Sequence, residues 1–75
     1  MPRSQHSDRY KQLRTRLFEQ RKKAGATQEQ LARRLGKPQS FISKYESGER
    51  RLDAIELLDV ARALEVPIAT LLRGL

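Results

Sequence analysis

Small polar side chains gather on one face of a predicted helix near the middle of the chain, where they could form hydrogen bonds to another molecule. At about 100° per residue, a helix from about Gln39 to Ser47 separates its polar side chains from its apolar ones. The outer face comprises Ser40, Ser43, Lys44 and Ser47, and the inner face comprises Ile42, Tyr45 and Glu46. Such a face can approach base edges in the major groove of DNA, with the amide of Gln39 pairing with adenine and Lys44 addressing guanine or a phosphate. The alternative is a solvated face on a small helical bundle.

A second short helix is predicted directly before this one. Thr27 can cap its first turn, and Gln30 completes a capping box. Apolar residues follow at helical spacing, namely Leu31, Ala32 and Leu35. Gly36 can adopt the left-handed conformation that ends a helix, Pro38 suits the start of the next helix, and Gly48 ends that one. Two short helices joined by a turn with glycine are typical of a helix-turn-helix.

Further helices are expected on both sides of this pair. The first should run from about Asp8 to Ala24, with Gly25 after it; its inward residues are Leu13, Leu17 and Ala24, flanked by Tyr10 and Phe18. Another should begin after the cap Asp53 and extend to about Leu64. Its apolar residues occupy more than one stripe: Ile55, Leu57, Leu58, Val60, Ala61 and Leu64. We therefore expect this helix to lie at the centre of the core.

Both ends of the chain raise separate expectations. Residues 1 to 7 are polar without periodicity, which predicts a mobile tail, and a basic arm tracking DNA through Arg3 and Arg9 is the alternative. Pro67 suits the start of a fifth helix. Its apolar stripe follows the i, i+3, i+4, i+7 rule through Ile68, Leu71, Leu72 and Leu75. We expect this stripe to form a homodimer interface; the alternative is that it packs back on the first helix.

Composition narrows the classes of function. The 75 residues carry 16 Lys and Arg against 9 Asp and Glu, a formal net charge of +7 that suits a polyanionic partner. There is no cysteine, which excludes a disulfide framework or thiolate zinc site and agrees with a reducing compartment. No apolar run is long enough to span a bilayer. His6 is the sole histidine, and we expect no catalytic site, no metal and no cofactor, and hence no enzyme.

The segment from about Leu13 to Leu72 resembles the phage repressor and Cro type of helix-turn-helix family, often called XRE-like. The matching residues are Arg21, the run Gly25-Ala26-Thr27-Gln28, Leu31-Ala32, Gly36, Ser40, Ile42-Ser43, the run Tyr45-Glu46-Ser47-Gly48, and the apolar helix after Asp53. The resemblance implies an all-α fold, a compact five-helix lambda-repressor-like domain over residues 8–75, with helices two and three as the helix-turn-helix. The chain departs from the family at Ala26, where a large aliphatic residue is usual. Phe41 is also unusual, and could touch a thymine methyl or pack on a neighbouring helix.

The resemblance also implies a DNA-binding site and a structural ion pair. Gln28 would clamp a phosphate, and the residues facing bases or nearby backbone would be Gln39, Ser40, Ser43 and Lys44. The residues lining the DNA backbone after the recognition helix would be Ser47, Arg50 and Arg51. Glu46 would pair with Arg21 inside the domain, and the desolvation of a carboxylate that faces the core supports this pairing. A phosphate contact is the alternative role for Arg21.

These observations predict a cytoplasmic, sequence-specific regulator of transcription that binds double-stranded DNA as a homodimer, with repression or autoregulation as the expected role. Two alternatives stay open. The first is the antitoxin of a toxin-antitoxin pair, with a toxin as protein partner. The second is the controller protein of a restriction-modification system, similar in size and architecture.

Overall fold

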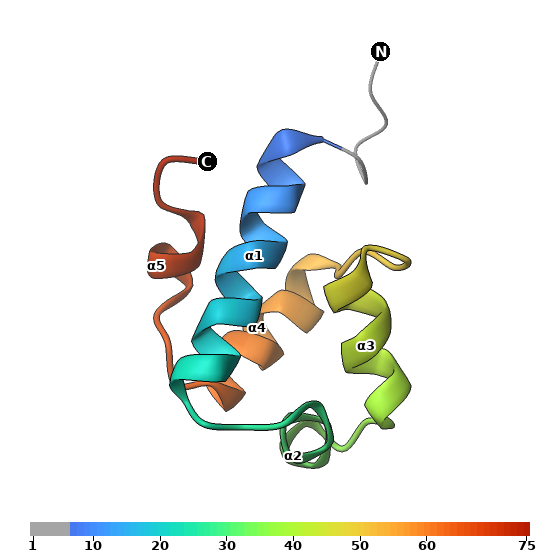
Figure 1. Cartoon of the computed structure of the whole chain (residues 1–75). Coiled ribbons are helices and arrows are strands. Elements are labelled where there is room, and N and C mark those ends of the chain that lie inside the picture. Colours follow the sequence, from blue (N-terminus) through green and yellow to red (C-terminus); the bar gives the residue numbers. More distant parts are fainter. Residues whose placement is uncertain (1–6) are drawn as a thin grey trace.

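Capping side chains and glycines set the helix boundaries in the computed structural model, which describes residues 7–75. Its five helices are α1 (Asp8–Lys23), α2 (Gln28–Leu35), α3 (Gln39–Ser47), α4 (Ala54–Ala63) and α5 (Ile68–Leu72) (Figure 1). Residues 7–75 contain no strand. The all-α fold expected from the sequence is confirmed, with α2 and α3 as the helix-turn-helix.

Reciprocal capping boxes begin two of the helices. The hydroxyl of Thr27 accepts the N–H of Gln30, and the Gln30 side chain accepts the N–H of Thr27. Asp53 and Glu56 do the same at the start of α4. Each box satisfies two backbone groups that would otherwise lack partners in the first helical turn.

The first helix begins at Asp8, as predicted, but the residue before it has a capping role that the sequence analysis did not assign. The Ser7 hydroxyl accepts the N–H of Tyr10 at 3.1 Å, so Ser7 is the N-cap of α1 and not part of a tail. The rest of the predicted tail, residues 1–6, lies outside the described residues. At the other end of α1, Ala24 is exposed, which corrects the expectation that it faces inward.

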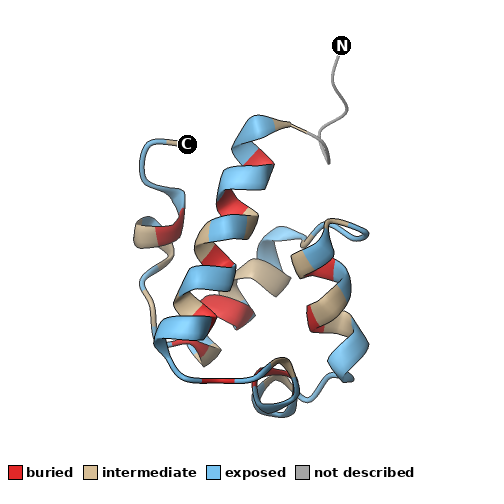
Figure 2. Ribbon diagram, in the orientation of Figure 1, coloured by how far each residue is buried: buried red, intermediate tan, exposed pale blue. Residues whose placement is uncertain are grey.

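The core contains buried side chains from all five helices: α2 packs on α3 and α4, and α1 packs on α3 and α5. α1 stands between α3 and α5, and α4 lies behind it (Figure 1). Buried residues occupy the inward faces of these helices while the outward faces are exposed (Figure 2). The side chains with the least exposure are Tyr45, Leu17, Leu31, Ile42, Leu71 and Val60. The two from α3, Ile42 and Tyr45, fix that helix against the domain by their apolar face.

The expectations about two apolar stripes are correct only in part. Ile55 on α4 is 66% exposed, and Leu57 and Leu58 are only partly buried, so three of the six apolar residues predicted for this helix are not buried. Leu71 is fully buried within the chain and belongs to its core, so it cannot contact a second copy. Periodicity alone could not separate these cases, because it does not say which neighbour covers a stripe.

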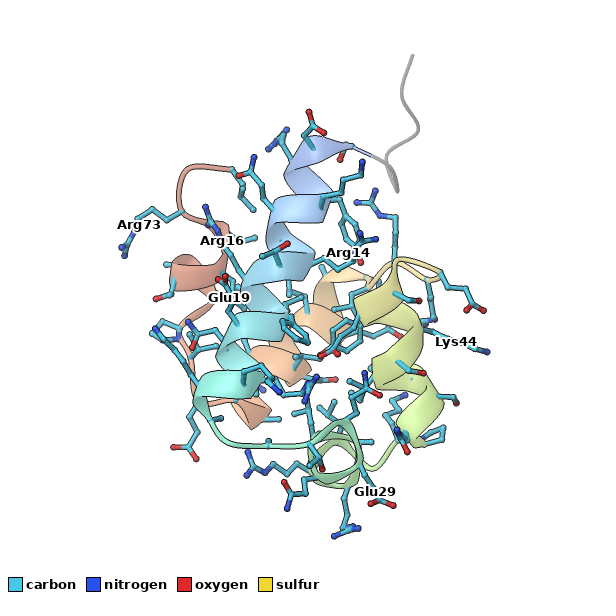
Figure 3. All side chains as sticks on the ribbon, in the orientation of Figure 1. Arg14, Arg16, Glu19, Glu29, Lys44 and Arg73 are labelled. Atoms are coloured by element: carbon cyan, nitrogen blue, oxygen red, sulfur yellow. The ribbon has the colours of Figure 1, made fainter. Side chains whose placement is uncertain are left out.

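Arginines of α1 and α2 hold the ends of the later helices. The Arg16 guanidinium donates to the carbonyls of Leu71 at 3.0 Å and Arg73 at 2.6 Å, and Figure 3 shows it directed towards α5. Arg34 donates to the carbonyl of Ala63 at 3.2 Å. These carbonyls lie at helix C-termini, where partners within the helix are missing.

Candidate nucleic-acid interface

The exposed side of α3 carries the polar residues predicted from the sequence. Gln39, Ser40, Lys44 and Ser47 are exposed and Ser43 is partly buried, while Ile42 and Tyr45 face the core. Lys44 points away from the body of the domain (Figure 3). One helix with a short polar face is the element that the major groove of DNA admits.

Two of the serines on this face bond within their own helix. The Ser43 hydroxyl donates to the carbonyl of Ser40 at 3.2 Å. The Ser47 hydroxyl donates to the carbonyl of Lys44 at 3.1 Å and accepts the N–H of Glu49 at 3.3 Å. Both hydroxyls keep a free lone pair or can rotate outward, so the bonds do not occupy the face.

The ion pair that the resemblance implies is present beneath this face. Arg21 Nε donates to Glu46 Oε2 at 2.7 Å and a second guanidinium nitrogen donates to Oε1 at 3.0 Å. Both side chains are below 10% exposed. The hydrogen bond to Glu46 raises the pKa of Arg21. The guanidinium also donates to the carbonyl of Ala26 at 2.9 Å, so Arg21 is enclosed in the domain and does not extend towards a phosphate.

Gln28 has a different environment from the one expected. Its Nε2 donates to Glu46 Oε1 at 2.9 Å, and its Oε1 accepts from Nε2 of Gln39 at 3.3 Å. The side chain therefore bridges the buried ion pair and the first residue of α3, leaving one amide N–H for a phosphate.

The two arginines predicted to line the DNA backbone, Arg50 and Arg51, have different partners in the loop after α3. Arg50 forms a bidentate pair with Glu56, at 2.7 and 3.0 Å. This hydrogen bonding raises the pKa of Arg50 and lowers the pKa of Glu56. Arg51 is exposed and makes no ion pair among the described residues; its guanidinium carbon lies 4.3 Å from the centre of the Tyr10 ring. Arg51 is thus the freer of the two for a phosphate.

Two residues that position this loop were missed from the sequence. Tyr10 of α1 accepts the N–H of Leu52 on its hydroxyl at 3.0 Å. Arg14 of α1 lies directly over Gly48, whose φ of +87° and lack of a side chain allow that approach. No spacing rule links such distant positions in the sequence. Together they attach the end of the recognition helix to α1.

Phe41 packs within the domain, which was one of the two alternatives predicted for it; the other was contact with a thymine methyl. Its ring meets the ring of Tyr45 edge to face at 5.8 Å between centroids. Lys37 Nζ lies 5.3 Å from the ring centre and Arg50 Cζ lies 5.1 Å from it. The ring helps to line a groove of about 410 Å³ between α2 and α4.

Among residues 7–75, no three His, Cys, Asp or Glu side chains are placed to hold a metal ion. No helix within that range is long and apolar enough to cross a membrane.

Two short helices at a left-handed glycine turn, the second with its apolar side in the core and its polar side exposed, define a helix-turn-helix DNA-binding domain. The family model described as "Helix-turn-helix" matches residues 17–71. The chain belongs to this helix-turn-helix family, of the XRE type, whose members are DNA-binding regulators.

Individual relatives agree with this assignment. A solved structure of an XRE-family like protein from Pseudomonas syringae pv. tomato is 52% identical, with a TM-score of 0.82 over 85% of this chain and 78% of that one. An uncharacterized transcriptional regulator in the ATPase CF(0) region of Rhodospirillum rubrum is 54% identical over 41 residues. That match covers 55% of this chain and 38% of the length of the regulator.

Proposed function

We propose that this protein binds a specific operator in double-stranded DNA as a homodimer and represses transcription, including that of its own gene. The observation that carries this proposal is the exposed polar face of α3 above a packed apolar face. Gln39, Ser40 and Lys44 have side chains that can pair with base edges, and nothing in the described chain covers them. A regulator of this kind acts where bacterial DNA is accessible, in the cytoplasm.

Phosphate contacts would set the position of the domain on the duplex. The N-terminus of α2 presents the positive end of a helix dipole beside Gln28 and Lys22. Lys44 on α3 and Arg51 in the loop after it supply exposed charges. Contacts to phosphates fix orientation, and contacts to bases select the sequence.

The homodimer rests on apolar side chains that the protomer leaves exposed. Leu72 on α5 is 42% exposed, while Ile68 and Leu75 are partly buried against the core. A second copy would cover these three residues around a twofold axis. Recognition helices related in that way would meet half-sites roughly 34 Å apart, one turn of DNA.

Selection from a random pool of duplexes about 40 base pairs long, at near-physiological salt, tests the proposal directly. An enriched inverted repeat with half-sites about one turn apart is the expected result. Binding without enrichment would contradict sequence-specific repression. A failure to bind any duplex would instead favour the antitoxin reading, in which a protein partner is the main ligand.

A further inference from the structure

The side chain of Arg51, in the loop after the recognition helix, lies over the ring of Tyr10 on α1. The guanidinium carbon is 4.3 Å from the centre of that ring. A contact of this kind uses the charge of the guanidinium and the face of the ring, and it does not consume the N–H donors. The Arg51 side chain donates no hydrogen bond and forms no ion pair among residues 7–75. Its N–H groups therefore stay available while the side chain is held.

The backbone at Arg51 is held as well. The carbonyl of Arg51 accepts a hydrogen bond from the Arg50 guanidinium at 3.2 Å. The N–H of the next residue, Leu52, donates to the Tyr10 hydroxyl at 3.0 Å. These two groups belong to one planar peptide unit, so both of its ends are bound. Arg50 is fixed in turn by its pair with Glu56, and the start of the Arg51 side chain therefore has a set position.

The charge around this contact favours an anion. A hollow of about 410 Å³ lies beside it, and the residues that line it are Ser7, Arg9, Tyr10, Leu13, Arg51 and Leu75. Two of these side chains are positively charged, and none of them is an aspartate or a glutamate. Because the loop that carries Arg51 directly follows α3, insertion of α3 into the major groove would bring this loop to the phosphates of the DNA backbone.

We propose that Tyr10 is a positioning residue for Arg51, whose guanidinium its ring holds ready to bind one phosphate of the DNA backbone. This inference rests on the proposed function. Tyr10 is only 4% exposed, so it acts through Arg51 rather than by touching DNA. A guanidinium that is held before binding loses less conformational entropy when it meets a phosphate. The ring and the phosphate use different parts of Arg51, and the two contacts are compatible in the complex.

A double-mutant cycle on DNA affinity tests the coupling between the two residues. Arg51→Ala should weaken the binding of a fluorescein-labelled duplex from the enriched pool, measured by fluorescence anisotropy at constant salt. In the Tyr10→Leu background the same change should weaken binding about threefold less than in the wild type, since the guanidinium is no longer held there. Equal effects in the two backgrounds would overturn the inference, because they would show that the residues act independently.

Two further variants make the cycle specific. Tyr10→Phe keeps the ring and removes only the hydroxyl, so Arg51→Ala should retain most of its effect in that background. A loss of effect as large as in Tyr10→Leu would overturn the role of the ring. Arg73→Ala is the matched control, at an exposed position on the opposite side of the domain from Lys44 (Figure 3), and should leave the affinity unchanged in every background.

The proposed function fails in a different way from this inference. If the proposed function is wrong, the wild-type protein itself binds no duplex or enriches no sequence. If only the inference is wrong, the wild type enriches an operator while the effects of Arg51→Ala and Tyr10→Leu on affinity are independent.

Nuclear magnetic resonance of the wild-type protein without DNA tests the positioning independently of folding in the variants. The Cδ protons of Arg51 should be shifted upfield by the ring current of Tyr10, and the side chain should show restricted motion, unlike that of Arg73. An Arg51 side chain as mobile as that of Arg73 would overturn the inference, whatever the variants do.

Discussion

A single carboxylate, Glu46, accepts hydrogen bonds from two different helices. Two come from Arg21 and one from Gln28, and the Arg21–Glu46 pair is almost fully removed from water. Removing one partner of a buried ion pair leaves the other charge unpaired, which costs far more than the pair contributes when intact.

Glu46→Ala should therefore lower the free energy of unfolding by about 3 kcal/mol, since Arg21 is left unpaired in the domain. Urea denaturation followed by circular dichroism measures this quantity. Glu49→Ala, at an exposed position in the loop after α3, should change it by less than about 0.5 kcal/mol. Equal midpoints for the wild type and Glu46→Ala would contradict the structural role of the pair.

The hydroxyl of Tyr45 is buried without a hydrogen-bond partner in the described part of the chain. Burial is the largest cause that raises the pKa of this hydroxyl above 10.0. Because the folded-state pKa is above the unfolded one, the folded protein holds the proton more tightly. The contribution of the neutral Tyr45 hydroxyl to the free energy of unfolding is present in full below about pH 10. As the pH rises above that value, the free energy of unfolding falls by about 1.4 kcal/mol per pH unit.

Tyr45→Phe should remove this alkaline loss, because phenylalanine has no proton to release. At neutral pH the variant should be as stable as the wild type or more so, since no hydrogen bond is lost. Thermal midpoints at pH 7 and pH 10.5 measure both effects. An equally steep alkaline decline in the two proteins would show that other groups cause it.

At the scale of the helices, charged side chains connect elements that are distant in sequence. α5 has only five residues, too few to persist as an isolated helix. Burial of Leu71 and the two hydrogen bonds from Arg16 hold it on α1. Hydrogen bonds from a charged donor are stronger than those from neutral groups.

Arg16→Ala should destabilise the protein by about 1.5 kcal/mol and increase hydrogen exchange at the amides of α5 before those of α1. Mass spectrometry of exchanged fragments measures this difference. Arg9→Ala, at an exposed position on the same helix, is the control and should leave α5 exchange unchanged. Identical exchange in both variants would contradict the role of Arg16.

The boundaries of the central helices could be predicted because their signals are local. Thr27, Gly36, Asp53 and Gly48 act within one turn of their own positions, and each lies where the sequence placed it. Ser7 has an equally local role but was missed, since it adjoins a polar stretch without periodicity.

The partners of the site residues were harder to predict because they are not local. The bonds of Gln28 to Glu46 and of Tyr10 to Leu52 join positions 18 and 42 residues apart. The resemblance implied the Arg21–Glu46 pair, whereas nothing in the sequence indicated that Arg50 pairs with Glu56. The identity of a charged residue does not reveal whether its charge is already neutralised by a neighbour.

On the scale of the whole molecule, the count of 16 Lys and Arg overstates the number of cationic side chains that are free to contact a partner. Arg21 and Arg50 are paired with carboxylates, and Arg16 and Arg34 bind helix carbonyls. Lys44 and Arg51 are exposed and make no ion pair among residues 7–75. The dependence of DNA binding on salt concentration should distinguish the arginines that have partners within the domain from the exposed Lys44 and Arg51.

Lys44→Ala and Arg51→Ala should each reduce the slope of log K against log salt concentration by about 0.9, if each contacts one phosphate. Arg50→Ala should lower the thermal midpoint with a smaller effect on the slope, since Glu56 already neutralises Arg50. Fluorescence anisotropy across a range of salt concentrations measures the slopes. Equal slope changes for Arg50→Ala and Arg51→Ala would contradict this division.

Dimerisation also belongs to this scale, and two residues of similar exposure offer a matched test. Leu72→Asp should yield monomers in analytical ultracentrifugation, whereas Phe18→Asp on α1, at 44% exposure against 42%, should leave the dimer intact. A monomeric wild type at high concentration would rule out the proposed homodimer.

The exposed face of α3 can be exchanged without rebuilding the domain. Ser40, Lys44 and Ser47 are exposed, and their side chains form no hydrogen bond or ion pair with another helix among the described residues, so libraries at these three positions should yield folded proteins directed to new operators. Position 39 differs from them because its side chain bonds to Gln28. Engineering of that position would have to alter residues 28 and 39 together, as one unit of design.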